Sequence, residues 1–192
     1  MISIDSEWQP VAFKEWQLVV DAILAGEQSV ILRKGGIAEG KAGFQWQHDR
    51  FFLFPTRFHQ QEEQVKTHAD GRARTIRPVG VEEGQVRFPA FAETIATRRI
   101  TSWEEVEALA PFHIWKEATI RERFEWGDEP GIFCAVIRSW RLSDPWVLED
   151  RKSFGGCRSW IDLPTDEAGG WRDRLATAEP VDAACGGPDW GA

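Results

Sequence analysis

One short segment, an apolar strand that runs directly into charge, most constrains how this chain can fold. Residues 29–32 are apolar enough for a buried strand, and Arg33, Lys34, Gly35 and Gly36 follow them. A buried strand requires a sheet around it, and glycines beside cations let backbone amides approach an anion. The segment therefore predicts a sheet-containing globular fold, and it makes these four residues either an anion site or a turn with an exposed lysine.

Two other strings have a comparable arrangement. Residues 51–60 read as an apolar strand that Pro55 ends, with polar side chains directly after it, and residues 154–160 contain a glycine pair before a cation. We expect the three strings to meet in one cationic hollow. The candidate ligand-binding residues that the second and third strings add are Arg57, His59, Gln60, Arg158 and Ser159.

Length and composition fit a single domain with a substantial core. The chain has 192 residues, of which 42% are hydrophobic and 28% charged, and these are values of globular proteins. No apolar run approaches the ~18 residues of a membrane-spanning helix, and no secretory signal opens the sequence. We expect a cytoplasmic protein without a membrane partner, with one α+β domain over residues 1–164 and a loosely ordered tail over 165–192.

Charge gives two readings of the surface. The formal net charge of −8 argues against broad affinity for nucleic-acid backbones. Arginines are nevertheless dense in one stretch of the chain, where they form either a local basic patch or part of a mixed-sign surface. These arginines are Arg72, Arg74, Arg77, Arg87, Arg98 and Arg99.

Metal and thiol chemistry find little support. The three cysteines are far apart, and the four histidines show no pair at the spacing of a metal site. The string from Glu149 to Lys152 has the residue types of a nuclease site but lacks the strand between them, so we interpret it as a charged turn. We predict no metal site, and the sequence identifies no cofactor.

Helical patterns occupy four main stretches. Residues 12–25 place apolar side chains three and four apart, and Gly26 ends that helix. Thr101 or Ser102 can cap a second helix that stops at Pro111. Further helices are predicted over 118–126 and 171–176, with a short exposed one in 58–66 before a basic loop over 68–78.

Strands lie between these helices in no regular order. Pro89 gives the first strand after the basic loop an edge position, because proline cannot donate to a neighbouring strand. Irregular interleaving favours an α+β domain with a mixed or mostly antiparallel sheet and flanking helices over a doubly wound one. The predicted strands cover residues 29–33, 85–91, 94–100 and 132–140, and residues 142–148 are also extended. Residues 44–47 and 50–54 are predicted as short strands or as one hairpin.

Four ordered strings resemble a bacterial family, the one catalogued as domain of unknown function 1802. They are WQLVVDAILAGEQSVILRKGGI, FFLFPTRFHQ, PFHIWKEATI and GGCRSWIDL. The resemblance implies no established activity, although members are associated with restriction-modification systems, which implies a nucleic-acid context.

A second resemblance concerns the segment from Ile23 to Arg33. It is similar to the helix–glycine–strand opening of ASC-1 homology domains, a PUA-like β-barrel group, through Gly26 and Arg33, with Gln28 and Ile31 where that group has lysine and glutamate. This resemblance implies a sheet that is partly closed.

Three functions follow as hypotheses. The first is a module that binds a nucleotide or a nucleic-acid segment through Arg33, Lys34, Arg57, His59 and Gln60. The second is a hydrolase of phosphodiesters or modified bases, with His59 as the base and Arg57 as the anion stabiliser. The third is a protein-interaction subunit whose acidic surface and exposed tryptophans meet a basic protein partner.

Overall fold

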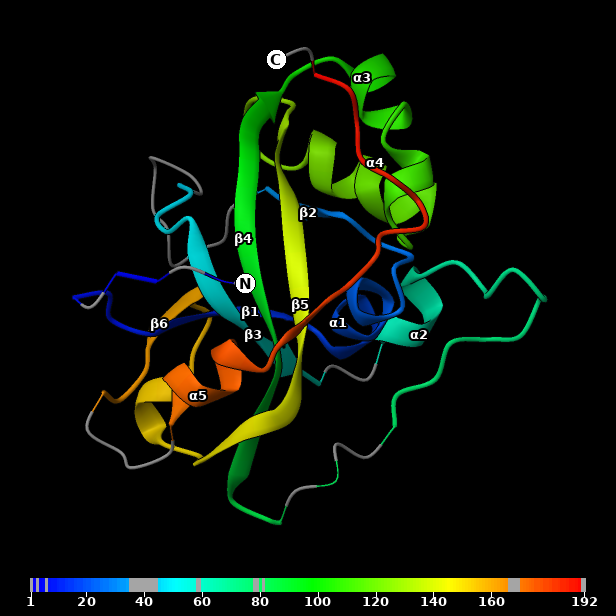
Figure 1. Ribbon diagram of the computed structural model, residues 1–192. Helices are drawn as coiled ribbons and strands as arrows, with labels where there is room; N and C mark the ends of the chain where they lie inside the picture. The colour runs from blue at the N-terminus through cyan, green and yellow to red at the C-terminus, as the bar shows by residue number, and fades with distance from the viewer. Residues whose placement is uncertain are drawn as a thin grey trace.

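The computed structural model describes residues 2, 4–5, 7–34, 45–57, 60–77, 80, 82–165 and 170–190. Its described strands form one sheet, in which the long β4 and β5 run side by side through the centre (Figure 1). The strands are β1 (Val11–Trp16), β2 (Val30–Arg33), β3 (Arg50–Thr56), β4 (Gln85–Ile100), β5 (Ile132–Glu149), β6 (Trp160–Asp162) and β7 (Glu179–Pro180).

The sheet is mixed but mostly antiparallel. Its order is β2-β5-β4-β3-β1-β6, with β7 paired to β5, and the β1–β3 pair is parallel. Among the described strands, β2 and β6 form the two ends of an open path. The predicted α+β class is therefore confirmed, while the strands that the structure describes do not form a partly closed sheet.

Both faces of the sheet carry hydrophobic core. Neighbouring residues of one strand point to opposite faces, so Phe51 and Leu53 belong to one buried cluster and Phe52 to the other. No helix in the described part of the chain is long and apolar enough to cross a bilayer. The helices are α1 (Gln17–Leu24), α2 (Gln61–Gln64), α3 (Trp103–Glu107), α4 (Glu117–Glu125) and α5 (Trp171–Ala176), with 3₁₀ turns at Ala110–Phe112 and Lys152–Phe154.

The predicted helix over residues 12–25 is half wrong. Its first part is strand β1, and only Gln17–Leu24 is helical. Strand β1 lies between β3 and β6 and is mostly buried on both faces, so its apolar residues do not alternate with polar ones. A strand of this kind cannot be distinguished from a buried helix by periodicity alone.

Pro89 does not put its strand at the edge of the sheet. The two strands predicted over 85–91 and 94–100 are one strand, β4, which lies between β3 and β5. The register with β5 shifts between Phe88 and Ala90, and pairing with β3 reaches only as far as Ala90. A bulge at Pro89 thus accommodates the missing N–H inside a central strand.

The predicted start of the next helix is confirmed, but the helix ends at Glu107 and Pro111 lies in the separate 3₁₀ turn Ala110–Phe112. Ser102 caps α3 by accepting a hydrogen bond from the Glu105 N–H at 3.5 Å, and Glu104 and Glu105 lie in the first turn as the helix dipole favours. Helices α4 and α5 lie where the spacing places them.

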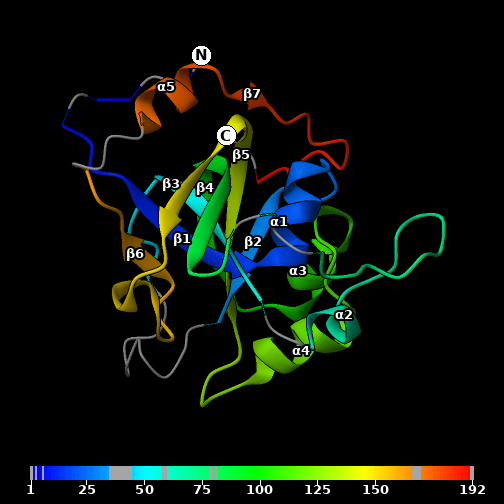
Figure 2. The same ribbon diagram turned by 90° about the horizontal axis from the view of Figure 1, so that it is seen from below.

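The stretch after residue 164 runs along the sheet. It contributes α5 and β7 and then crosses β5 towards α1 (Figures 1 and 2). The Val181 N–H donates to Ser139 O at 2.9 Å and the Cys185 N–H to Gly26 O at 3.3 Å. Gly26 has a φ of 71°, and a Cβ there would lie 2.3 Å from Asp182 O, so this crossing needs glycine.

Candidate nucleic-acid interface

Lys14, in β1, is the point at which the three strings meet. Its carbonyl accepts a hydrogen bond from the Arg33 guanidinium, and its N–H donates to Ser159 O at 2.8 Å. Its Nζ donates to Gly156 O at 3.0 Å and lies 5.8 Å from the centroid of the Phe54 ring, across from it in β3. Segments far apart in sequence therefore share one neighbourhood.

Arg33 is committed to the protein itself. Its guanidinium lies 3.4 Å from the Glu15 carboxylate, which is 1% exposed, and 4.8 Å from the Phe13 ring centroid. Its side chain is 20% exposed, and its buried Nε has no hydrogen-bond partner among the described residues. The Glu15 carboxylate therefore balances the Arg33 charge inside the fold.

Lys34 is also engaged with the backbone. Its Nζ donates to Phe124 O at 3.0 Å and to Glu129 O at 2.6 Å. These bonds tie the end of β2 to α4 and to the turn after it. Burial lowers the pKa of the Lys34 amine, and the Arg99 charge lowers it further.

A first hollow, the Lys14 groove, opens beside Lys14. It has a volume of about 760 Å³ and is bordered by the ends of β3, β4 and β5. Burial lowers the pKa of the Lys14 amine, as does the nearby Arg158. The charged and aromatic residues that line the groove are Lys14, Phe54, Arg57, Glu82, Glu83, Arg87, Asp150, Arg151, Lys152 and Phe154.

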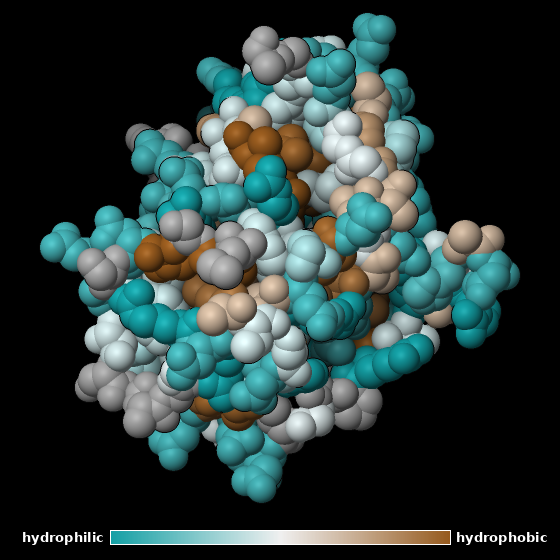
Figure 3. Space-filling model, viewed as in Figure 1, coloured by the Kyte–Doolittle hydropathy of each residue, from teal (hydrophilic) through white to brown (hydrophobic). Residues whose placement is uncertain are grey.

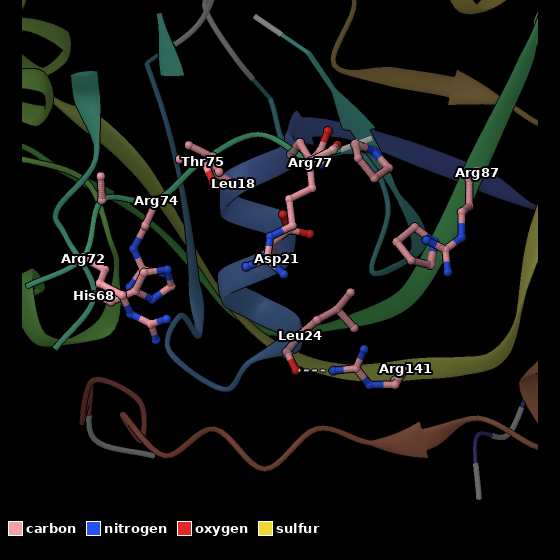
Figure 4. Close-up of a pocket in the computed structure, with 14 residues that line it drawn as sticks. Leu18, Asp21, Leu24, His68, Arg72, Arg74, Thr75, Arg77, Arg87 and Arg141 are labelled. Carbon is pink, nitrogen blue, oxygen red and sulfur yellow. Dashed lines mark hydrogen bonds between the residues drawn. The ribbon is translucent and has the colours of Figure 1, made fainter. Parts of the chain in front are cut away.

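A second hollow, the arginine pocket, lies over helix α1. Its volume is about 590 Å³ (Figure 4). Arg72 and Arg74 approach from one side with His68, while Arg87 of β4 and Arg141 of β5 lie on the other side. Arg77 lies above Asp21, the one carboxylate among the described lining residues.

Some of these arginines have partners on the pocket wall. Arg74 forms a 2.6 Å ion pair with Glu27, Arg72 a 2.6 Å pair with Asp70, and Arg141 donates to Leu24 O at 2.6 Å. The Arg77 carbonyl accepts from the Gln17 amide at 2.8 Å, which fixes the backbone at the pocket's edge.

The Arg77 guanidinium has no hydrogen bond or ion pair to any residue within the described ranges. Burial raises the pKa of the Asp21 carboxyl, although Gln17 and the Arg77 and Arg87 charges act against that rise. The pocket thus holds cations in excess over its own carboxylate.

The two hollows adjoin each other. Pro55 and Arg87 line both hollows. The end of β3 therefore separates the two hollows, and the Arg87 side chain borders both of them. On the viewed face of the molecule, apolar residues reach the surface only in separate small areas among polar ones (Figure 3).

Of the other predicted site residues, some lie at or near the Lys14 groove and others do not. Arg57 lines the Lys14 groove, and Arg158 lies near it and donates to Ser153 O at 2.7 Å. Ser159 is engaged through its backbone, and Gln60 is exposed at the start of α2. Gly35, Gly36 and His59 lie outside the described residues.

Sequence reasoning did not select the arginine pocket, although a signal was present. Four of the six clustered arginines line it. Arg98 and Arg99, at the other end of β4, instead form ion pairs with Glu105 and Glu129. The pocket gains Arg141 from β5, which no local pattern connects with the cluster.

The described residues contain no group of three or more histidine, cysteine, aspartate or glutamate side chains arranged to hold a metal ion. Within this part of the chain, cations and one carboxylate line the arginine pocket, and cations, carboxylates and phenylalanine rings line the Lys14 groove.

Known structures share this architecture. The ASCH structure from Zymomonas mobilis is 14% identical with a TM-score of 0.51, covering 89% of this chain and 96% of its own. Two point mutants of that protein give 13% identity with a TM-score of 0.52, covering 89% of this chain and 97% of theirs, and 14% with 0.50, covering 90% and 100%. At such low identity the likeness shows the fold alone, which is ASCH-like.

Sequence comparison identifies the family. None of the curated proteins matches this chain. A family model, described as a domain of unknown function, matches residues 12–177, which is most of the sequence. The chain therefore belongs to the DUF1802 family.

Proposed function

We propose that this protein binds nucleic acid and that the arginine pocket holds its phosphates. The observation that carries the proposal is that, among the described residues, five guanidinium groups gather around one carboxylate, in a chain whose net charge is −8. They come from a loop, from β4 and from β5, so local sequence clustering alone does not account for the pocket.

Phosphate is the anion that suits this lining best. Guanidinium groups present paired N–H donors that match phosphate oxygens, and they stay charged at any physiological pH. The pocket lies in the size range of small-ligand sites. Arg77 makes no ion pair with the described residues, so it can take up a phosphate without first losing one.

Because the whole molecule is negatively charged, nucleic acid can bind only where cations are concentrated locally. An acidic protein repels a polyanion at long range, so binding depends on the few cations that contact the phosphates. The resemblance to proteins associated with restriction-modification systems makes DNA a ligand to test beside RNA.

Fluorescence anisotropy with labelled single-stranded RNA and DNA of about 12 nucleotides tests the proposal. We expect the wild type to bind and the affinity to fall steeply between about 50 and about 200 mM salt. Arg77→Glu should weaken binding about tenfold or more, because it removes a charged hydrogen-bond donor and adds a repulsive charge.

Arg98→Glu is the matched control. It makes the same charge change at the far end of β4, where Arg98 pairs with Glu105. An acidic peptide of equal charge serves as a second control, and it should bind more weakly than the oligonucleotide. Equal losses from both substitutions, or equal binding of the peptide, would contradict a phosphate site in the arginine pocket.

A further inference from the structure

We infer that the Lys14 groove is a nucleobase subsite, in which one unpaired base of a single strand stacks on Phe54. The inference rests on the proposed function, since it assigns the second hollow to the same strand whose phosphates occupy the first. Three features of the groove support it: an aromatic ring, a mixed charge and a connection to the arginine pocket.

Phe54 offers a fixed aromatic surface in the groove. Its half-buried ring packs 5.3 Å from the Phe88 ring and 6.2 Å from the Phe154 ring, measured between centroids. These neighbours hold the ring in place, so little side-chain freedom is lost when a base stacks on it. Any of the bases can use such a surface, because each has a π face.

The charge pattern of the groove suits the edge of a base better than a phosphate. Five cationic side chains from the described part of the chain line it, as in the arginine pocket, but here three carboxylates accompany them. Carboxylates repel phosphate, whereas they accept hydrogen bonds from the N–H groups of bases. The carboxylates are Glu82, Glu83 and Asp150.

Asp150 is the best placed of these acids. Its backbone N–H donates to Gly84 O at 2.7 Å, which joins the two walls of the groove at this point. Its negative charge acts to raise the pKa of the Lys14 amine, which burial lowers, and the Lys14 ammonium lies 5.8 Å from the Phe54 ring centroid. A base over that ring would have both a donor and an acceptor near its polar edge.

The connection between the hollows requires a single-stranded nucleic acid. Pro55 and Arg87 line both, so a phosphate in the pocket and a base in the groove would lie on either side of them. In a duplex, the base is stacked and its pairing edge is occupied, so it cannot enter a side groove.

The test compares two polyanions, a single-stranded oligonucleotide and inorganic polyphosphate of equal charge. Wild-type protein should bind the oligonucleotide at least several-fold more tightly. Phe54→Leu keeps an apolar side chain but loses the stacking face, so it should remove most of that preference and leave polyphosphate binding unchanged. Thermal melting of each variant verifies that it is folded.

Asp150→Asn should change the affinities for the two ligands in opposite directions. Removing the carboxylate should weaken oligonucleotide binding a few-fold, because an acceptor for base N–H groups is weakened, and should strengthen polyphosphate binding. Asp128→Asn, an exposed aspartate outside the groove, is the control and should change neither.

The other outcomes overturn the inference in different ways. If Asp150→Asn strengthens binding of both ligands, the groove takes phosphate and not a base. If wild type binds both ligands equally, there is no base subsite, but the phosphate site in the arginine pocket stands. If it binds neither, the proposed function fails as well.

Discussion

Cations at the end of β2 and cations in the arginine pocket have different roles in this molecule. Arg33 faces a buried carboxylate, and Lys34 donates to two backbone carbonyls. Arg77 makes neither kind of contact with the described residues and lines a hollow open to solvent. Arg33 and Lys34 stabilise the fold, whereas Arg77 is available to a ligand.

The difference shows why a strand that ends in charge is an ambiguous signal. The sequence around Arg33 states which residue types occur there, but Glu15, on another strand, determines what the guanidinium does. Desolvated cations require such a partner, since an unpaired charge is costly to bury.

The largest expected effect concerns Glu15. Glu15→Gln leaves the Arg33 guanidinium facing a neutral amide in a largely buried position, so we expect a loss of about 3–5 kcal/mol in the free energy of unfolding. Denaturant titration measures it. Glu105→Gln, in an exposed pair with Arg98, should cost no more than ~1 kcal/mol.

If the two variants are equally stable, the contrast between the regions breaks. Arg33 would then not depend on Glu15 and would again be a strong candidate for ligand binding.

The second prediction concerns His113, a buried group without a carboxylate partner among the described residues, and the dependence of folding stability on pH. Burial, together with the Lys66 and Arg123 charges, lowers its pKa from 6.5 to about 3 in the folded state. The unfolded chain therefore takes up a proton below pH 6.5 that the folded chain does not, and stability falls as the pH drops from about 6.5 towards 3. Between pH 7 and pH 5 this loss should be about 2 kcal/mol.

The measurement is the free energy of unfolding against pH for wild type and His113→Gln. The glutamine can still accept the hydrogen bond that the His113 ring accepts from the Trp115 N–H at 3.1 Å. A variant with the same pH dependence as wild type would show that another group causes the loss.

The smallest effect separates Lys34 from Arg77 directly. Lys34→Met removes the donor to Phe124 O and Glu129 O and should cost about 1–2 kcal/mol, with oligonucleotide affinity unchanged. Arg77→Met should change stability by less than ~0.5 kcal/mol and weaken binding. Reversed results in melting and anisotropy would exchange the roles of the two regions.

Several elements could be predicted from local sequence because local forces specify them. Ser102 and the glutamates after it determine the start of α3, and the helical spacing and glycine boundary of α4 are equally local. Strand β1 resembles a helix in its sequence because burial on both faces removes the alternation that identifies a strand.

The candidate site depends on sheet order, which the sequence does not state. Arg57 could be predicted as a lining residue because it directly follows β3. Arg141 could not, since it reaches the arginine pocket only because β5 pairs with β4. The placement of His59, Gly35 and Gly36 in a site stays a prediction, as does the domain boundary after residue 164.

The position of β1 in the sheet has a consequence for synthesis on the ribosome. Its two partners, β3 and β6, begin at Arg50 and Trp160, so β1 cannot have both of its edges paired until the chain has been made past Trp160. Contacts so distant in sequence slow folding, and a nascent chain that exposes Val11 to Phe13 meanwhile offers an apolar segment to chaperones.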